Sequence, residues 1–401
     1  MIAKNEIEAR MRWTHGSRQA EKVGRANPPN FPPGHGRGVG PWGIPMGLSA
    51  ARPQVRYPLT EPDAIGRACT VGRSVPLPTF YFGLAEKQPD LGGIETLSEK
   101  SMEDTTMKFE NIKGSIVAMI TPFHEDGSVN FEVLTELLER QIAEGTDGIL
   151  TLGTTGEYPT MSHEEDASVV EHTIKVVNGR VPVIVGSGSN CTSTQLEKSI
   201  QYQDMGADAL LLISPYYNKA NPEGMYRHFA ETADAVNIPC LLYNVPGRTG
   251  CSIPVSVVEK LSKHPNITGI KEASGDMSYA MKIAHCIGPD FALYSGNDDI
   301  TLPLMSIGGS GVISVYANVM PRMCHQIVED YLSGNQAQAL ANHLKYLELM
   351  NNLFIEVNPI AVKSAMNMMG LNVGPMRLPL CEMSQDHQAI LRASLKEAGL
   401  L

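Results

Sequence analysis

The sequence predicts an α/β protein whose main part, residues 107–335, is a (β/α)8 barrel of the TIM type. Apolar segments rich in β-branched residues alternate with segments of helical periodicity and recur about every 25 to 35 residues, as βα units require. Each apolar segment is uninterrupted, which is typical of parallel strands that helices cover on both faces. The eight expected strands are SIVAMITP (115–122), DGILTLG (147–153), VPVIVGSG (181–188), ALLLISPYY (209–217), IPCLLYNVP (238–246), ITGIKEAS (267–274), FALYSGND (291–298) and GVISVYAN (311–318).

Helical patterns follow these strands. The first two expected helices run from Phe131 to Ala143 and from His163 to Val177. One helix after the last strand is enough to close a barrel, yet residues 336–401 continue in segments rich in Leu, Met, Ala, Gln and Lys. They predict a small C-terminal helical extension, and we expect it to serve packing or contact between copies of the chain rather than catalysis.

Residues 1–106 differ in composition from the rest. They hold 12 of the 27 prolines, together with Gly-rich pieces, and show no sustained period of 2 or 3.6 residues. They carry 13 basic and 11 acidic side chains, so the remaining residues carry 19 and 32 and form an acidic body. This composition predicts a disordered tail. The tail lacks the apolar core of a secretory signal, and Glu6, Glu8 and Glu21 interrupt the pattern of an organelle transit peptide.

Translation that begins at Met102 or Met107 would account for this tail, because MKFENIKGSIVAMITPF has the character of the start of a domain. We favour this origin over a transit peptide. An intact mass near 43.5 kDa for the natively expressed protein would contradict it.

The composition, with 42% apolar and 19% charged residues, is that of a protein with a sizeable core. The sequence contains no apolar run of about twenty residues, so we expect no membrane-spanning helix. The net charge of −11 argues against a nucleic-acid surface and favours a cytoplasmic protein. The seven cysteines are scattered without paired spacing, so we expect reduced thiols, no disulfide framework and no structural zinc.

In a (β/α)8 barrel the active site lies at the carboxyl ends of the strands. The less common residues of the chain fall at these ends: GTTGE (153–157), PYYN (215–218), YNVPGRTG (243–250), Lys271, Gly296 and Ile313. They therefore converge on one face of the predicted barrel.

Lys271 lies inside a segment that otherwise has the pattern of a buried strand. An unpaired ammonium group is costly outside water unless it loses its proton, and a neutral lysine is a nucleophile. The alternative is an ordinary lysine at the end of an edge strand, whose flexible stem reaches solvent.

Thr154 and Thr155 stand between two glycines, Gly153 and Gly156. Their hydroxyls and the backbone N–H groups of this loop could hold a small carboxylate. The alternative is a tight turn between strand and helix, for which such a pair of glycines is also typical.

Tyr243 ends the strand next to that of Lys271, so its phenol could exchange protons in a dry site, or it could be a core tyrosine. Tyr216 and Tyr217 are open to the same two interpretations. Arg248 could clamp a carboxylate with its planar fork, or be an ordinary exposed arginine in a loop.

Other ligand sites are less well supported. The GGSG segment (308–311) precedes the eighth strand, so it lies on the face opposite the active site and predicts a tight turn rather than a phosphate loop. Asp298, Asp299 and the histidines form no credible metal set. A strand lysine with nearby tyrosine and threonine hydroxyls and no metal indicates Schiff-base chemistry on a carbonyl substrate.

From about Lys113 to Leu401 the chain resembles the dihydrodipicolinate synthase (4-hydroxy-tetrahydrodipicolinate synthase) family, Schiff-base-forming lyases of diaminopimelate and lysine biosynthesis. The motifs GSIVAMITP, GTTGE, SPYYN, YNVPGRTG and GIKEASG occur in this order. The resemblance implies an enzyme without a cofactor that condenses pyruvate with L-aspartate 4-semialdehyde.

The resemblance also implies roles for residues. Lys271 would form the Schiff base, and Tyr243, Thr154 and Tyr217 would relay protons, with Tyr217 reaching the site of a neighbouring subunit. Thr155 would hold the carboxylate of pyruvate, Arg248 that of aspartate semialdehyde, and Gly296 and Ile313 would line the pocket. A shared tyrosine requires a dimer, and such families form homotetramers built from dimers.

A lysine feedback site carries over only in part. His163, Asn190 and Tyr216 stand at matching positions, but Tyr158, Asp166 and Thr194 stand where lysine-inhibited members often have Ser, His and Glu. We therefore expect weak or absent inhibition by L-lysine.

Two alternatives stay open. A sibling pyruvate-dependent aldolase for N-acetylneuraminate or a 2-keto-3-deoxy sugar acid would keep the barrel, the lysine and the tyrosine, but would replace Arg248 by hydroxyl-binding groups. A non-catalytic barrel that binds a keto acid would need no proton relay.

Overall fold

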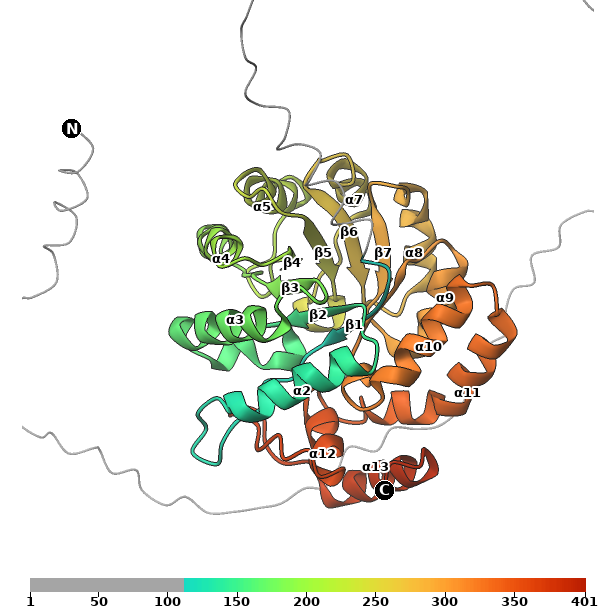
Figure 1. Cartoon of the computed structure of the whole chain (residues 1–401). Helices are drawn as coiled ribbons and strands as arrows, with labels where there is room; N and C mark the ends of the chain where they lie inside the picture. Colours follow the sequence, from blue (N-terminus) through green and yellow to red (C-terminus); the bar gives the residue numbers. More distant parts are fainter. Residues whose placement is uncertain (1–111) are drawn as a thin grey trace, which may run out of the picture. The chain divides into compact units, whose positions relative to one another are not determined.

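The structure is a computed structural model that describes residues 112–401. Its parallel strands are hydrogen-bonded in chain order and close into a barrel, because β8 also pairs with β1. The predicted (β/α)8 barrel is confirmed (Figure 1). The strands are β1 (Gly114–Ala118), β2 (Gly148–Thr151), β3 (Val183–Gly186), β4 (Ala209–Ile213), β5 (Cys240–Asn244), β6 (Ile267–Glu272), β7 (Ala292–Ser295) and β8 (Gly311–Ser314). The tail predicted for residues 1–106, and its expected origin, lie outside the described residues.

Helices surround the barrel in the order that βα units require (Figure 1). They are α2 (Phe131–Ala143), α3 (His163–Val177), α4 (Thr192–Asp204), α5 (Pro222–Asp234), α7 (Val255–Leu261), α8 (Met277–Ile283), α9 (Thr301–Ser306) and α10 (Pro321–Leu332). The helix α3 begins with a reciprocal capping box between Ser162 and Glu165, which satisfies backbone N–H groups at its first turn.

Short helical turns occupy the loops between these elements. They are η1 (Thr154–Gly156), η2 (Tyr158–Thr160), α6 (Pro246–Thr249), η3 (Ala284–Cys286), η4 (Asp298–Ile300) and η5 (Tyr316–Asn318). All except η3 follow the carboxyl end of a strand, where they shape the loops around the site.

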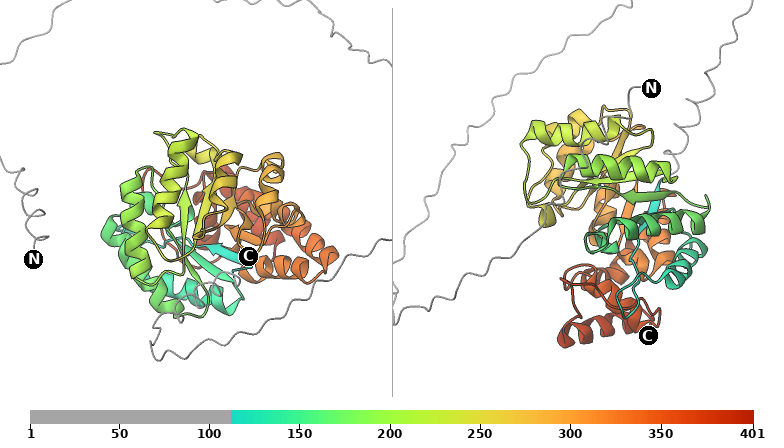
Figure 2. Two further views of the ribbon diagram at one scale, coloured as in Figure 1. Left: turned by 90° about the horizontal axis from the view of Figure 1, so that it is seen from above. Right: turned by 90° about the vertical axis from the view of Figure 1, so that its left-hand side faces the viewer.

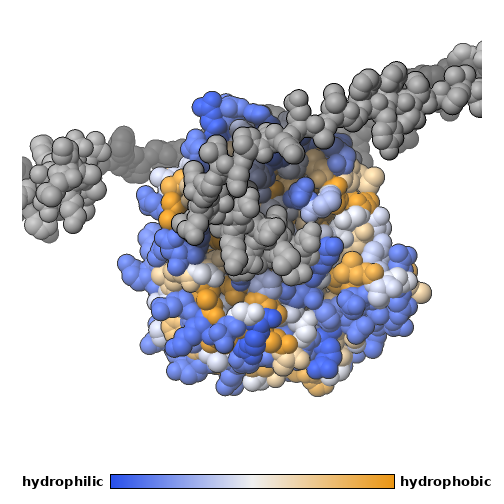
Figure 3. Space-filling view, turned by 45° about the horizontal axis from the view of Figure 1, so that its top comes forward, coloured by the Kyte–Doolittle hydropathy of each residue, from blue (hydrophilic) through white to orange (hydrophobic). Residues whose placement is uncertain are grey.

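Two apolar clusters hold the barrel together. The inner one fills the barrel with side chains such as Leu150, Leu241 and Ile313. The outer one lies between the strands and their helices and includes Leu138 and Phe229. Truncation of such a fully buried side chain to alanine costs about 2–5 kcal/mol. The face shown in Figure 3 is mainly hydrophilic, with apolar residues in small groups among the described atoms.

The GGSG segment lies where the sequence predicted, at the amino end of β8. Gly311 has φ +149°, and a Cβ at this position would collide with the carbonyl oxygen of Gly114 on β1. Glycine is therefore required here by the close approach of two strands, not by a phosphate group.

The C-terminal extension consists of α11 (Gln336–Asn352), α12 (Ile360–Met368) and α13 (Gln385–Glu397). Its predicted first residue, 336, is also the first residue of α11. The helix α11 packs against α10, and α13 packs against both α11 and α12. Figure 2 shows the last helices gathered at one end of the barrel.

No helix within residues 112–401 is long and apolar enough to cross a membrane. The described cysteines are free thiols, and Cys240 and Cys324 are buried. The cytoplasmic location expected from charge and cysteine pattern stays a prediction.

Candidate active site

A cavity of about 760 Å³ opens at the carboxyl ends of the strands. Its wall combines barrel residues with a segment of the C-terminal extension. The predicted site residues Thr154, Thr155, Tyr243, Arg248, Lys271 and Gly296 all line it. The convergence expected from strand ends is therefore present in the structure.

Lys271 lies on β6 with its side chain in the barrel mouth and only 5% exposed. It makes no hydrogen bond or ion pair with any described residue. Burial lowers the pKa of Lys271 to about 7; Asp298 opposes this shift and Arg248 adds to it. Its amine is therefore substantially neutral near pH 7, as a nucleophile requires.

A second buried lysine, Lys363 on α12, shows the opposite arrangement. Its Nζ forms a 2.8 Å ion pair with Glu157 and donates to the carbonyl oxygens of Thr121 and Pro375. Burial lowers the pKa of Lys363, but Glu157 counters that effect. Lys363 is thus held as a charged structural group, which distinguishes it from the unpaired Lys271.

Tyr243 is the direct neighbour of Lys271, because the two residues pair in the register of β5 and β6. The Nζ atom of Lys271 lies 4.7 Å from the centroid of the Tyr243 ring. Burial raises the pKa of the Tyr243 phenol, while Arg248 and a hydrogen bond with Thr154 act in the opposite direction. Lysine, phenol and threonine hydroxyl thus form a continuous group.

Thr155 is buried next to this group. Its Oγ1 accepts a 3.0 Å hydrogen bond from Nδ2 of Asn358, which directs the hydroxyl proton of Thr155 to another acceptor. Asn358 also accepts a 3.2 Å hydrogen bond on its backbone oxygen from Arg248. Asn358 therefore connects the two residues expected to bind carboxylates.

Gly296 keeps the space beside the lysine open. A Cβ here would lie 3.1 Å from Cε of Lys271 and 2.5 Å from Cβ of Ala273. Ile313 is placed differently from the expectation: its side chain is fully buried in the inner barrel cluster and does not line the cavity. Val315, two residues nearer the carboxyl end of the barrel, lines the wall instead.

Tyr217 does not line the cavity of its own chain. Its side chain is 91% exposed, and its backbone has φ +66°, which is uncommon for a residue with a side chain. A large exposed aromatic side chain on a strained backbone is consistent with contact to a second chain, as expected from the resemblance.

The residues of the expected effector site lie on the neighbouring loops. His163 is exposed at the start of α3, and Nδ2 of Asn190 donates to the backbone oxygen of Tyr216 over 3.3 Å. Asp166 is buried and forms a 2.7 Å ion pair with Lys198. Its carboxylate thus already has a cationic partner within the chain.

The cavity wall also includes residues that the sequence analysis missed. Phe354, Ile355, Glu356, Val357 and Asn358, between α11 and α12, line the cavity. We expected the C-terminal extension to serve packing or contact between copies of the chain, and this segment of it also lines the cavity. The only signal in the sequence was the Asn-Pro pair at 358–359, which predicts a break in helical structure but not its position over the barrel.

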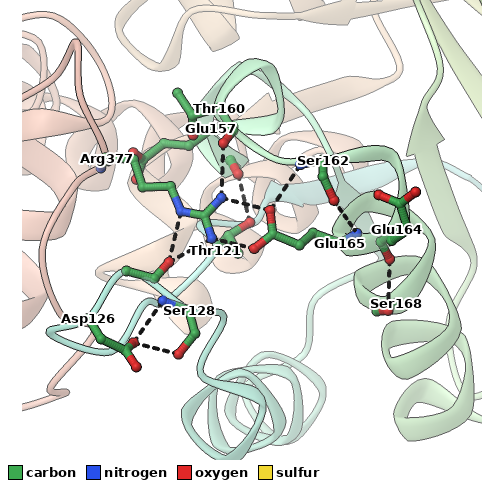
Figure 4. A network of polar contacts seen from close by, with 12 residues as sticks. Thr121, Asp126, Ser128, Glu157, Thr160, Ser162, Glu164, Glu165, Ser168 and Arg377 are labelled. Carbon is green, nitrogen blue, oxygen red and sulfur yellow. Dashed lines mark hydrogen bonds and ion pairs between the residues drawn. The ribbon is translucent and has the colours of Figure 1, made fainter. Parts of the chain in front are cut away.

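Polar contacts fix the loop after β2 to the extension (Figure 4). Glu157 accepts a 3.0 Å hydrogen bond from the backbone N–H of Arg377, in addition to its ion pair with Lys363. The guanidinium of Arg377 binds Glu165 and donates to the backbone oxygens of Thr160 and Gly127. Charge-assisted bonds of this kind hold the loop that carries Thr154 and Thr155.

These features define a class of protein: a (β/α)8-barrel enzyme with a buried, unpaired lysine at the carboxyl ends of its strands. Residues 111–398 match the model of the Dihydrodipicolinate synthetase family. The chain belongs to this family, and the resemblance predicted from its motifs is confirmed.

Individual relatives agree with this assignment. The chain is 51% identical over 289 residues to a 4-hydroxy-tetrahydrodipicolinate synthase from Clostridium perfringens strain SM101, covering 72% of this chain and 99% of the relative. A crystal structure of dihydrodipicolinate synthase from Aquifex aeolicus aligns with TM-score 0.70 and 42% identity, covering 72% of this chain and 99% of that one. The chloride-inhibited enzyme from Acinetobacter baumannii, complexed with pyruvate, aligns with TM-score 0.71 and 41% identity over 72% of this chain and all of that one.

Proposed function

We propose that this chain condenses pyruvate with L-aspartate 4-semialdehyde through a Schiff base on Lys271, as a 4-hydroxy-tetrahydrodipicolinate synthase. One observation carries the proposal: Lys271 is buried, unpaired and adjacent to Tyr243 in an open cavity. The similarity to named synthases and to a pyruvate-bound family member supports the choice of substrates.

The first half of the reaction consumes pyruvate. Neutral Lys271 attacks the keto carbon, water leaves, and an imine forms between Nζ and that carbon. Loss of a proton from the methyl group then gives an enamine. Tyr243 and Thr154, which are hydrogen-bonded partners, are placed to carry the protons of these steps.

The second half joins the two substrates. The enamine carbon attacks the aldehyde carbon of the semialdehyde, and the alkoxide formed takes up a proton. The ammonium group of the bound product loses a proton, its nitrogen adds to the imine carbon, and Nζ takes up a proton and leaves as a C=N bond forms in the ring. This step closes a six-membered ring and returns free Lys271.

Two groups are suited to the substrate carboxylates. Thr155, whose oxygen already accepts from Asn358, has its hydroxyl proton free for the carboxylate of pyruvate. Arg248 lines the same cavity and offers a planar fork to the carboxylate of the semialdehyde. A sugar-acid aldolase would need hydroxyl-binding groups at this place, so Arg248 favours the short semialdehyde.

We propose further that the protein is a homotetramer built from dimers. The exposed Tyr217 supports this arrangement, because its phenol would complete the proton relay only in the cavity of a second copy of the chain. Tyr217→Phe should then lower kcat while the oligomer, measured by light scattering, stays intact. A fully active monomer would contradict this assembly.

We also propose that L-lysine inhibits the enzyme weakly or not at all. Thr194 stands where lysine-inhibited members often have Glu, so an incoming ammonium group loses an obvious carboxylate partner, and Asp166, which stands where they often have His, already forms an ion pair with Lys198. Half-inhibition below about 1 mM, equivalent to about 4 kcal/mol if read as a dissociation constant, would contradict this expectation.

Borohydride trapping tests the main proposal. The protein is incubated with pyruvate, reduced, digested and mapped by mass spectrometry, and a parallel sample receives aspartate semialdehyde before product analysis. We expect an adduct on Lys271 and a cyclic product. An adduct without condensation would indicate a sibling aldolase, and no adduct on Lys271 would exclude the Schiff-base mechanism.

A further inference from the structure

Glu356 is the one acidic side chain among the described residues that line the cavity. It shares the wall with two basic residues, Arg248 and Lys271. A carboxylate in a pocket that receives two carboxylate substrates would repel them and weaken binding. A positive charge that arrives with a substrate would instead be attracted to this carboxylate.

The two oxygens of Glu356 are used differently. Oε1 accepts three hydrogen bonds: from the backbone N–H of Ser384 at 3.0 Å, from its hydroxyl at 2.9 Å and from Nδ1 of His387 at 2.7 Å. Oε2 makes no hydrogen bond with any described residue. The side chain is thus anchored through one oxygen while the other can accept from a ligand.

The surroundings keep this carboxylate charged and partly shielded from water. The hydrogen bond from His387, together with those from Ser384, lowers the pKa of Glu356. The Glu356 side chain is 20% exposed. A partly desolvated, charged acceptor forms stronger hydrogen bonds than one in bulk water.

Arg248 is bound by the same segment that carries Glu356. Arg248 donates to the backbone oxygen of Asn358, two residues after Glu356, over 3.2 Å. The cavity wall thus carries one carboxylate and one guanidinium, and the segment 354–358 supplies the first and binds the second. This pair of opposite charges matches an α-amino acid, which carries an ammonium and a carboxylate on the same carbon.

We infer that Glu356 binds the α-ammonium group of the amino-aldehyde substrate while Arg248 binds its α-carboxylate. The inference rests on the proposed condensation and adds a specificity residue to it. With the aldehyde carbon placed at the enamine on Lys271, three contacts fix the substrate and select one enantiomer.

A purely structural role for Glu356 gives a different expectation. In that case the residue only tethers the start of α13, where Ser384 is the N-cap. Glutamine at 356 keeps an oxygen for Ser384 but removes the negative charge. Loss of the tether would affect all substrates alike, whereas loss of the ammonium contact affects only a substrate that has the ammonium.

The test compares L-aspartate 4-semialdehyde with succinate semialdehyde, which lacks the amine. The full-length protein is charged with pyruvate, mixed with either aldehyde and quenched with borohydride. The measured quantity is the aldehyde concentration that gives half-maximal consumption of the pyruvate adduct on Lys271. Wild type, Glu356→Gln and Glu356→Asp are compared, with Glu382→Gln, an exposed carboxylate outside this cavity, as the matched control.

We expect Glu356→Gln to raise this concentration by about 10- to 100-fold for the amino-aldehyde, the usual cost of a lost charge-assisted hydrogen bond, and by less than about twofold for succinate semialdehyde. Formation of the pyruvate adduct should be unchanged, and Glu382→Gln should behave as wild type. Should the glutamine variant form no adduct because it misfolds, Glu356→Asp carries the same comparison, since it keeps the charge but withdraws it by one methylene.

Equal losses for both aldehydes, or no loss for either, would overturn the inference and leave the proposed reaction standing. A wild-type protein that forms no adduct, or an adduct that neither aldehyde consumes, would overturn the proposed function and the inference with it.

Discussion

The rate at which pyruvate is trapped on Lys271 should rise with pH through about 7 and then level off. Burial lowers the pKa of Lys271 to about 7, so about half of the molecules hold a neutral amine at pH 7. A lysine with an ordinary pKa is neutral in only roughly 0.04% of molecules at this pH. The pocket thus increases the nucleophilic fraction by about a thousandfold.

Two substitutions should move this midpoint in opposite directions. Besides burial, the charge of Asp298 raises the pKa of Lys271 and the charge of Arg248 lowers it. Asp298→Asn removes an anion that favours the protonated amine, so the midpoint should fall. Arg248→Met removes a cation that disfavours it, so the midpoint should rise. Asp299→Asn, on the exposed neighbour of Asp298, is the matched control.

Borohydride quenching between about pH 5.5 and 9.5, with the adduct quantified by mass spectrometry, gives the midpoint for each variant. A rate that still increases towards pH 10 would show that Lys271 is solvated and would refute the argument from burial. The same shift in the Asp299→Asn control would show that net charge, rather than the position of Asp298, is responsible.

Three further predictions concern stability and packing. Lys271→Met should stabilise the fold by about 2–5 kcal/mol at pH 7 and below, because the folded protein then no longer holds a lysine whose pKa is lowered. The gain should fade as the pH rises towards the pKa of an unfolded lysine, near 10.4. Urea unfolding at several pH values measures this gain, and its absence at pH 7 would contradict the prediction. Gly296→Ala should reduce the rate at which pyruvate is trapped on Lys271 by at least about tenfold, because a methyl group would press on Lys271 and Ala273. An unchanged rate would mean that the loop after β7 moves aside. Lys363→Met should lower the free energy of unfolding by about 3–5 kcal/mol, because Glu157 is left buried without its partner. A change below about 1 kcal/mol would show that water reaches the ion pair.

The fold could be predicted almost completely because parallel strands covered on both faces leave uninterrupted apolar runs, which repeat at the spacing of βα units. The positions of Lys271, Tyr243 and Thr154 at strand ends also predict that they lie on one face of the barrel. Their mutual geometry then follows from register alone, since Tyr243 and Lys271 are paired residues of adjacent strands.

The contribution of the C-terminal extension could not be predicted in the same way. Asn358 and Glu356 lie more than 80 residues after Lys271, in a segment without regular periodicity. Their position depends on how α11 and α12 pack over the barrel, which is a tertiary property. The sequence pattern also does not show how deep a strand residue lies in the barrel: Ile313 belongs to the inner barrel cluster, and Val315, two residues nearer the carboxyl end, lines the wall instead.

The ion pair between Glu157 and Lys363 spans 206 positions of the chain, and the hydrogen bond between Thr155 and Asn358 spans 203. During synthesis the barrel strands therefore leave the ribosome before the partners that hold the loop after β2. Domains generally form in the order in which they are made, and contacts this distant are completed last. The wall of the pocket is therefore incomplete until the C-terminal segment has emerged and packed on the barrel.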